Sequence, residues 1–458
     1  MAREAPTHPG SFLLGSAREL LANQVEFFES TYAGGNDLVR VVVGPPGMRH
    51  SLYLSHTPAG AEALLSARTM AAFRKDNPLY GEVRMVLGDG ILTAQDDDWL
   101  RQKRFIQPIF TRTRVDGYLD QMIDTIAATT AEMGRGDAGS TVDLGDQMMR
   151  MTLRIVGRVL LGDDTAELEE AVHDHFPVAS QGMLTRALFP MRMPLSWPLP
   201  VNRRTAKAQQ ALFEVCDKLI ARRRAGESDG DDLARLLVEA RDGQDRLSDE
   251  EVRDQLLIFL LAGHETTSTS LTFALHLLGC HPDVQERLRE EALAVFGDGV
   301  PTAAQVHEDL PWTTAVLKES MRLYPATPFN GRLCVEDTEV DGCLVPAGSD
   351  LLVSVWNIHR RPDLYPDPER FDPSRFLPEN DAGRGRYDWI PFGAGPRACI
   401  GQHFSMLESV AALALMVRDL EFRAPAGVTD RVRVGSALTL HPIDPVRSEV
   451  SALSTRPR

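Results

Sequence analysis

Hydrophobic residues recur every three to four positions along most of the chain, the spacing typical of helices that bury one face. The longest such pattern covers 252–278, and Ser248 and Glu251 before it have the Ser-x-x-Glu spacing of a capping box. The pattern therefore predicts a mainly helical protein. Further helical stretches are expected at 58–67, 117–161, 165–175, 202–224, 282–296, 310–323 and 400–420.

Strand-like runs are short and few. Residues 38–43 and 51–54 flank a Gly-Pro-Pro-Gly turn and predict a small hairpin. Similar runs lie at 332–334 and 349–355, and residues 432–440 suggest a closing hairpin. The expected fold class is therefore mainly α with small β-sheets.

Two stretches interrupt the helical pattern. Residues 176–200 hold five prolines and three methionines, which is typical either of a mobile apolar lid or of an irregular connection packed on the core. Residues 362–391 are rich in proline and almost free of regular pattern, which predicts a long irregular connection.

Composition and charge exclude several classes of protein. The 458 residues are 43% hydrophobic and 25% charged, as in ordinary folded proteins, and the net charge of −16 argues against a general nucleic-acid binder. Five scattered cysteines argue against a disulfide framework and suit a reducing cytoplasm. No run of about 18 uncharged apolar residues predicts a membrane span, and no signal-peptide pattern opens the chain. Since no linker is visible, we expect one domain over 1–458, with an irregular tail at 1–10.

The segment from Phe392 to Gly401 carries the most specific chemistry. Its glycines allow tight turns and close approach to a flat cofactor, and Cys399 lies just before a predicted helix, where the dipole favours a thiolate. The alternatives are a buried inert cysteine and a zinc site using His403, for which no second cysteine is near.

This segment fits F-x-x-G-x-R-x-C-x-G in full, with Gly395, Arg397 and Cys399 at fixed positions, and it resembles the haem-binding loop of the cytochrome P-450 superfamily. The resemblance implies the P-450 fold, with haem b (iron protoporphyrin IX) between a long distal helix and the cysteine loop. Cys399 would be the proximal iron ligand, because a thiolate pushes electron density through the iron. Phe392, Gly395, Arg397 and Gly401 would surround it.

Ala262-Gly263-His264-Glu265-Thr266 lies in the middle of the longest predicted helix, where glycine and β-branched residues are poor choices. Such local inconsistency often marks a functional site. The segment resembles the oxygen-activating stretch of the family, which implies that Ala262 and Gly263 lie over the haem and that Thr266 and Glu265 are catalytic. The alternative is a Thr266 hydroxyl bonded to the carbonyl one turn back. We expect His264 to be structural.

The resemblance also implies partners for the haem carboxylates, an indole N–H from Trp99 and cations from basic residues. Trp99 and Lys103 are four apart, after an acidic stretch expected to cap their helix, and match a family pair in which arginine is common at the second position. Arg332 and Arg397 are the further candidates. In the family, residues 76–95 cover the substrate; from the residues alone, a packed core segment is as good an interpretation.

Glu319 and Arg322 are three apart and share a helical face. In the family such a pair meets an arginine from the meander and holds the fold around the haem loop. Two arginines compete for this place, Arg370 in a literal P-E-R-F word and Arg375 in the better-fitting position. We predict Arg375.

The expected protein is a cytoplasmic, monomeric monooxygenase that uses O2 on a hydrophobic small molecule, such as a terpenoid or fatty acid. No flavin or nicotinamide domain is visible, so electrons are expected from a ferredoxin and ferredoxin reductase. The alternatives are a peroxide-driven peroxygenase and a non-catalytic haem sensor.

Two sets of residues are relevant to the expected substrate and the expected electron donor. The apolar pocket candidates are 79–92, 183–197, Phe329 and Leu438, and the basic residues that either steer ferredoxin or are merely solvated are Arg101, Lys103, Arg104, Arg112 and Arg114.

Overall fold

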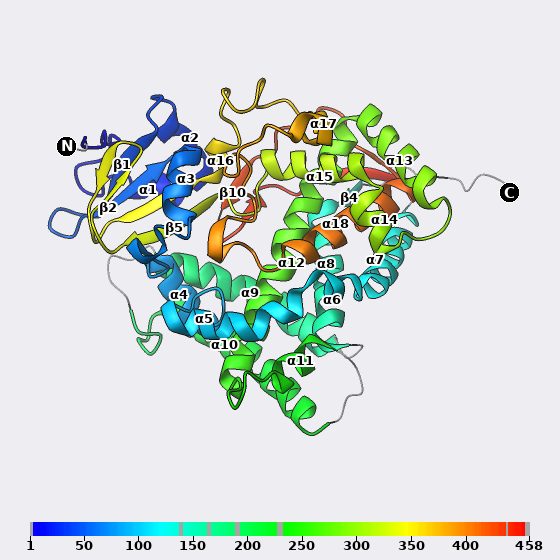
Figure 1. Ribbon diagram of the computed structural model, residues 1–458, viewed down its shortest axis with the longest axis horizontal. Helices are drawn as coiled ribbons and strands as arrows, with labels where there is room; N and C mark the ends of the chain where they lie inside the picture. Colours follow the sequence, from blue (N-terminus) through cyan, green and yellow to red (C-terminus); the bar gives the residue numbers. More distant parts are fainter. Residues whose placement is uncertain are drawn as a thin grey trace.

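A computed structural model describes residues 3–136, 141–162, 166–187, 193–226, 232–436 and 438–453. Helices make up most of the molecule, and the largest sheet lies beside the N-terminal helices at one end (Figure 1). The prediction of a mainly α protein with small sheets is confirmed.

The largest sheet combines strands from both ends of the sequence. Its order is β1 (Leu38–Val43), β2 (His50–Ser55), β8 (Asp350–Ser354), β5 (Phe329–Cys334) and β3 (Phe73–Arg74). The predicted β1–β2 hairpin is antiparallel, with Val41 opposite Leu52. The parallel pairing of β2 with β8 then joins this hairpin to the second half of the chain.

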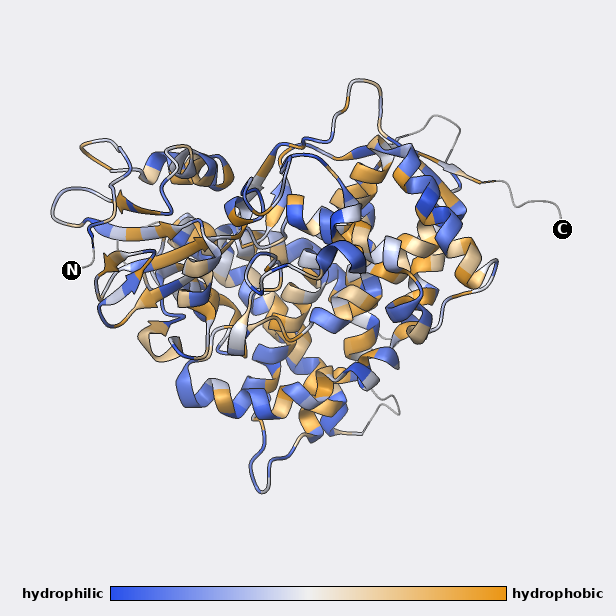
Figure 2. Cartoon of the chain, turned by 45° about the horizontal axis from the view of Figure 1, so that its top comes forward, coloured by the Kyte–Doolittle hydropathy of each residue, from blue (hydrophilic) through white to orange (hydrophobic). Residues whose placement is uncertain are grey.

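Helix α12 (Asp249–Cys280) crosses the middle of the molecule, and α8 (Leu144–Leu161), α15 (Pro311–Leu323) and α18 (Gln402–Asp419) pack around it (Figure 1). The predicted capping box is present: the Glu251 amide donates to Ser248 Oγ at 3.2 Å, and the Ser248 amide donates to Glu251 Oε2 at 2.7 Å. Figure 2 shows hydrophobic and hydrophilic positions mixed along the outer helices, as expected when each buries one face.

The other elements surround this centre. The remaining helices are α1 (Ala17–Ala22), α2 (Gln24–Tyr32), α3 (Pro58–Leu65), α4 (Pro78–Leu87), α5 (Asp96–Ile106), α6 (Arg112–Asp116), α7 (Leu119–Met133), α9 (Ala166–Ala187), α10 (Pro200–Arg224), α11 (Leu233–Glu239), α13 (Pro282–Phe296), α14 (Ala303–Glu308), α16 (Val355–Ile358) and α17 (Pro378–Asp381). The remaining strands are β4 (Thr141–Asp143), β6 (Thr338–Val340), β7 (Cys343–Val345), β9 (Leu420–Arg423), β10 (Val434–Ser436), β11 (Leu440–Pro442) and β12 (Arg447–Ala452). Short 3₁₀ turns lie at Met70–Ala72, Gln107–Phe110, Pro373–Phe376 and Gly395–Arg397. The closing hairpin predicted at 432–440 is the β10–β11 pair.

The interpretation of 176–200 as irregular is wrong for its first half. Helix α9 continues to Ala187 and includes Pro177. Its residues Phe176, Ala179 and Met183 are buried in the main core, so tertiary packing outweighs the hydrogen bond that proline removes. Residues 188–192, which belong to the predicted lid, lie outside the described residues.

The expectation that an acidic residue caps α5 is wrong. Residues 96–98 form the first turn of α5, whose N-cap is Gln95, so their side chains do not cap the helix. Their negative charges still interact favourably with the positive end of the helix dipole. Within the described ranges, the structure contains no helix that is both long enough and apolar enough to cross a bilayer.

Candidate functional site

Cys399 lies between a 3₁₀ turn at Gly395–Arg397 and the start of α18, whose N-cap is Gly401. The loop is closed by the Cys399 amide, which donates to the Phe392 carbonyl at 2.9 Å. Cys399 is exposed to solvent, although many protein atoms surround its thiol. Burial raises its pKa, and the Gly401 amide and the Lys75 ammonium partly oppose that rise by favouring a thiolate.

The middle of α12 has an open face. Almost every residue from Val252 to Leu261 is buried, whereas Ala262 is exposed and Gly263, Glu265 and Thr266 are partly exposed. Just beyond them, the Thr267 hydroxyl lies 3.2 Å from the hydroxyl of Ser405 in α18. Helix α12 therefore contacts the helix that follows Cys399 one residue beyond its open face.

One glycine in each segment packs tightly against another part of the protein. Gly395 has φ +71°, and a Cβ there would lie 1.8 Å from the Leu65 carbonyl oxygen, so only glycine fits. A Cβ at Gly263 would lie 2.9 Å from a methyl group of Val156 in α8. Gly263 thus allows α12 to approach α8, and both Ala262 and Gly263 belong to the open face.

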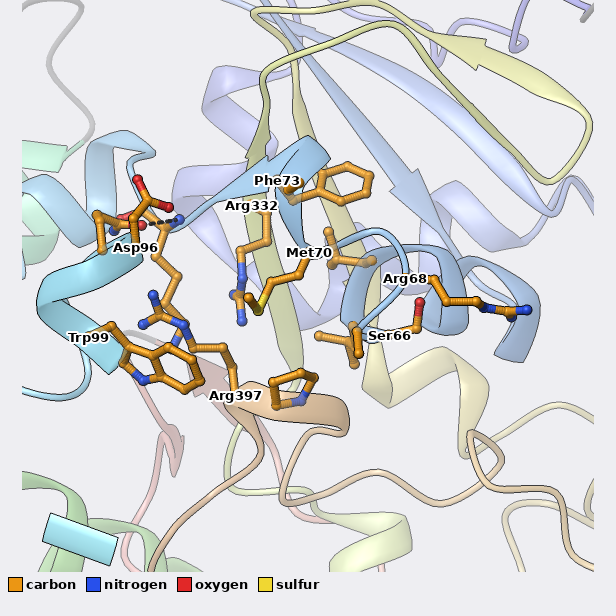
Figure 3. Close-up of a pocket in the computed structure, with 15 residues that line it drawn as sticks. Ser66, Arg68, Met70, Phe73, Asp96, Trp99, Arg332 and Arg397 are labelled. Carbon is orange, nitrogen blue, oxygen red and sulfur yellow. Dashed lines mark hydrogen bonds between the residues drawn. The ribbon is translucent and has the colours of Figure 1, made fainter. Parts of the chain in front are cut away.

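Trp99, Arg332 and Arg397 line one cavity of about 280 Å³. Figure 3 shows the two guanidinium groups converging beside the indole ring, with Arg68 pointing away. The Arg397 guanidinium carbon lies 4.2 Å from the centre of the Trp99 ring, and Arg397 Nη1 donates to the Ala94 carbonyl at 2.7 Å. Burial and the nearby Arg332 charge lower the pKa of Arg397 to about 10.

Lys75 also lines this cavity, and together with Arg332 and Arg397 it forms a cluster of three cations. The sequence analysis did not predict a role for it. Its side chain is buried, and its Nζ donates to the Leu92 carbonyl at 3.3 Å. Burial, followed by the charges of Arg332 and Arg397, holds the pKa of Lys75 well below its usual value. A lysine next to the 76–95 segment was the available signal, but its sequence neighbours Arg74 and Asp76 make it look like an ordinary surface charge.

Lys103 is placed differently. Its Nζ donates to the Pro396 carbonyl at 3.2 Å and lies 4.9 Å from the Trp99 ring centre, so it supports the cysteine loop from outside the cavity lining. Spacing on the helix correctly put Lys103 beside Trp99, but it could not show which way the ammonium would turn.

Glu319 and Arg322 form a fully buried ion pair with Nε–Oε2 and Nη2–Oε1 distances of 2.6 and 2.8 Å. Arg375 Nε lies 3.4 Å from Glu319 Oε1. Arg370 offers only its backbone carbonyl, which accepts from Arg322 at 3.2 Å. Of the two arginines compared from the sequence, Arg375 is therefore the one beside Glu319. Arg322 also donates to the carbonyls of His359 and Pro368, which ties the helix to the irregular meander.

The polar residues of α12 differ in environment. Thr266 Oγ1 donates to the Ala262 carbonyl at 2.7 Å, the alternative foreseen from the sequence, and α12 continues without a break. Burial raises the pKa of Glu265 to about 7, opposed by a hydrogen bond from Thr439, and its Oε2 has no hydrogen-bond partner among the described residues. His264 contacts the Leu260 carbonyl and the Phe176 ring, and burial lowers its pKa to about 4. These contacts agree with a structural role for His264.

The residues present fit a haem. An accessible thiol lies in a tight loop, and α12, which has an open face, contacts the helix that follows this loop. Three cations, the buried Lys75 and Arg332 and the partly buried Arg397, have no carboxylate within 4 Å among the described residues. Buried charges are normally paired, so a cofactor with two carboxylates suits this cluster. No group of three or more His, Cys, Asp or Glu side chains in the described part of the chain could hold a metal ion.

Comparisons with known proteins agree with this geometry. The cytochrome P450 family model matches residues 10–445. Cyclooctat-9-en-7-ol 5-monooxygenase from Streptomyces melanosporofaciens is 35% identical over 92% of this chain and 90% of its own length. Pentalenene oxygenase from Streptomyces avermitilis is 32% identical over 90% of each chain. The crystal structure of a cytochrome P450DA haem domain aligns with a TM-score of 0.87 and 26% identity, over 99% of this chain and 98% of that one. The chain therefore belongs to the cytochrome P450 family and is a haem-thiolate monooxygenase.

Proposed function

We propose that this monooxygenase hydroxylates a terpenoid or a similar hydrophobic small molecule, as a single domain in the cytoplasm, with haem b as its cofactor. The observation that carries the proposal is a cluster of three cations, Lys75, Arg332 and Arg397, that lies near Cys399 and has no carboxylate partner among the described residues. Two similar proteins are named for the oxidation of cyclooctat-9-en-7-ol and pentalenene, which supports the terpenoid class.

The cofactor and the protein have distinct parts. When bound, a haem-thiolate centre supplies the activation of O2 and the insertion of one oxygen atom into a C–H bond. Cys399 would hold the iron, with its thiolate favoured by the Gly401 amide and by Lys75. Arg332, Arg397 and Lys75 would bind the carboxylates, and the Trp99 ring would hold Arg397 in place.

Thr266 and Glu265 would bind water and supply protons during the reaction. The Thr266 hydroxyl donates to the Ala262 carbonyl and retains lone pairs that can accept a hydrogen bond from water. Glu265, with a pKa of about 7, is partly protonated at neutral pH and is suited to donating a proton. Because adjacent residues lie about 100° apart on a helix and Glu265 interacts with Thr439, its side chain would have to turn toward Thr266 to act with it.

A ferredoxin remains the proposed electron donor, although the basic cluster is weaker than the sequence indicated. Arg101 pairs with Asp245 and Glu251, and Arg104 with Asp242. Arg112, 3.8 Å from Glu308, and exposed Arg114 are left as the more available cations. Docking would therefore depend on these two residues of α6.

The experiment is carried out in two stages on the purified holoprotein. A red-shifted Soret band after reduction and addition of carbon monoxide is expected, and its absence from a haem-loaded protein would refute thiolate ligation. Terpenes, fatty acids and polyketides are then screened by the absorbance change that accompanies substrate binding, and hits are tested for turnover with ferredoxin, its reductase and O2. Turnover with peroxide alone would instead indicate a peroxygenase, and binding without turnover would indicate a sensor.

A further inference from the structure

Helix α12 carries six hydroxyl residues between positions 266 and 272. Four of them donate to carbonyls of their own helix at 2.7–3.0 Å: Thr266 to Ala262, Ser268 to Glu265, Ser270 to Thr266 and Thr272 to Ser268. Such bonds need no other element. The other two differ, because each contacts a distant element: Thr267 contacts Ser405 in α18, and Thr269 donates to the Leu440 carbonyl in β11.

The contact of Thr267 is with the helix that begins after the cysteine loop. Its Oγ1 lies 3.2 Å from Ser405 Oγ in the first turn of α18. Thr267 is buried and Ser405 is partly exposed. Since a buried hydroxyl that lacks a partner destabilises a protein, Thr267 favours the arrangement of the two helices in which Ser405 is within reach.

Ser405 is connected to the cysteine through the first turn of α18. The Ser405 amide donates to the Gly401 carbonyl at 2.9 Å. The Gly401 amide in turn interacts with the Cys399 thiol and favours its thiolate form. A continuous series of hydrogen bonds therefore runs from Thr267 through Ser405 and Gly401 to the sulfur.

The other end of this series lies at the residues proposed to bind water and supply protons. Thr267 directly follows Glu265 and Thr266 in α12, which is an unbroken helix here. Because consecutive residues of a helix have fixed relative positions, a bond that fixes Thr267 also fixes the backbone of these two neighbours.

We propose that Thr267 and Ser405 are positioning residues for the monooxygenase reaction, whose mutual hydrogen bond fixes the Glu265–Thr266 segment of α12 relative to the loop that holds Cys399. The proposal rests on the haem-thiolate function, because that function assigns the two segments to opposite sides of the reacting atoms. A hydrogen bond is directional and selects one arrangement of the helices. Apolar contacts alone tolerate several arrangements, and packed cores lose uniqueness before they lose stability.

The test is a double-mutant cycle of the wild-type protein, Thr267→Val, Ser405→Ala and the double variant. Valine keeps the branched shape of threonine and removes only the hydroxyl. Ser405→Ala leaves the buried Thr267 hydroxyl without its partner, so the double variant, which removes that hydroxyl as well, should be the more stable of the two. Thr267→Ser keeps a hydroxyl at this position and should behave like the wild-type protein.

The first measurement is the infrared band of carbon monoxide bound to the reduced holoprotein, which responds to groups on both sides of the iron. Loss of the bond should let several helix arrangements coexist, so the band should become about twofold broader in each single variant. The double variant should be no broader than the single variants, because all three lack the same bond. A merely structural role would instead return the double variant to the wild-type band as its stability recovers.

The second measurement does not depend on the iron ligand. Hydrogen exchange of a peptide containing residues 399–405 should become about three- to tenfold faster in the single variants, as expected when one hydrogen bond no longer opposes local opening. The double variant should again match them.

Two buried hydroxyls provide matched controls. Thr272 donates within its own helix, and Ser409 Oγ in α18 has no partner among the described residues. Thr272→Val and Ser409→Ala should leave the band width and the exchange of residues 399–405 unchanged, and equal effects in these controls would overturn the proposal. Multiplied effects in the double variant would also overturn it, since the two hydroxyls would then act independently.

This proposal and the proposed function fail in different ways. A missing red shift of the Soret band in the wild-type carbon monoxide complex would refute thiolate ligation. A double variant with wild-type band width and wild-type hydrogen exchange would refute positioning by Thr267 and Ser405, while the red shift would remain.

Discussion

The Arg397 guanidinium lies over the Trp99 indole ring, 4.2 Å from its centre. Since Trp99 is in α5 and Arg397 precedes Cys399, this contact joins the cysteine loop to a helix from a distant part of the sequence. A stacked arginine loses little freedom when it binds a carboxylate. The contact thus holds one of the three proposed carboxylate-binding cations in position.

Lys75 is predicted to matter more for haem retention than Lys103. Lys75→Met should weaken retention about tenfold or more, because a hydrogen bond to a charged group contributes about 1.5–3 kcal/mol. Lys103→Met is the matched control, since Lys103 bonds a backbone carbonyl outside the cavity lining. Haem transfer to apomyoglobin measures both. A larger loss for Lys103→Met would contradict the assignment.

Glu265 should make stability depend on pH. Its pKa is raised from 4.5 to about 7, so the folded protein favours the protonated carboxyl. Its contribution is fully present below pH 4.5 and is lost as pH rises to about 7. Relative to Glu265→Gln, the wild-type holoprotein should lose at most about 3 kcal/mol of unfolding free energy across this range. Denaturant titrations at several pH values measure the difference, and a flat difference would show that Glu265 is not desolvated.

Arg375 and Arg370 form a second matched pair of variants. Arg375→Met removes one partner of the buried Glu319, so it should lower the free energy of unfolding by about 1–3 kcal/mol. Arg370→Met should cost less than about 0.5 kcal/mol, because its side chain is exposed and only its carbonyl takes part. Urea unfolding followed through the Soret band compares them. The reverse order of costs would favour the P-E-R-F arginine.

The glycines around Cys399 should differ in tolerance. Gly395→Ala should prevent haem incorporation, because the new Cβ would lie 1.8 Å from the Leu65 carbonyl at a positive φ. Gly401→Ala should be tolerated, because its Cβ would lie 3.9 Å from Cys399 Sγ, at ordinary contact distance. The haem-to-protein absorbance ratio distinguishes them. A haem-loaded Gly395→Ala protein would show that the Leu65 contact can be relaxed.

Arg112→Glu should raise the KM for ferredoxin several-fold at low salt, with a smaller effect at high salt. The control is Arg150→Glu, an exposed arginine of α8 that pairs with Asp146 at 3.0 Å. The KM for ferredoxin is measured at two ionic strengths from the rate at which reduced ferredoxin reduces the haem of this protein. If both variants behave like the wild-type protein, ferredoxin does not dock on α6.

The sequence predicted features that depend on local spacing. The capping box before α12 and the β1–β2 hairpin needed only neighbouring residues, and both are present. The cysteine motif and the position of Arg375 in the meander were recognised from the spacing of residues along the sequence, which can be read without knowing the fold. Features set by distant contacts were missed. Pro177 remains helical because its neighbours are buried, Lys75 turns inward toward Arg332 and Arg397, and Glu82 meets Arg186 only through the packing of α4 on α9.

The order of strands in the largest sheet has a consequence for synthesis of the chain. Strands β1, β2 and β3 are made early, but β8 and β5 lie between β2 and β3. Strand β3 lacks its hydrogen-bond partner until Cys334 of β5 has been made, and the edge of β2 lacks its partner until β8 has been made. Unpaired strand edges are prone to aggregation. A nascent polypeptide arrested before this point would therefore depend on chaperones, whereas one extended past β8 could complete the sheet by itself.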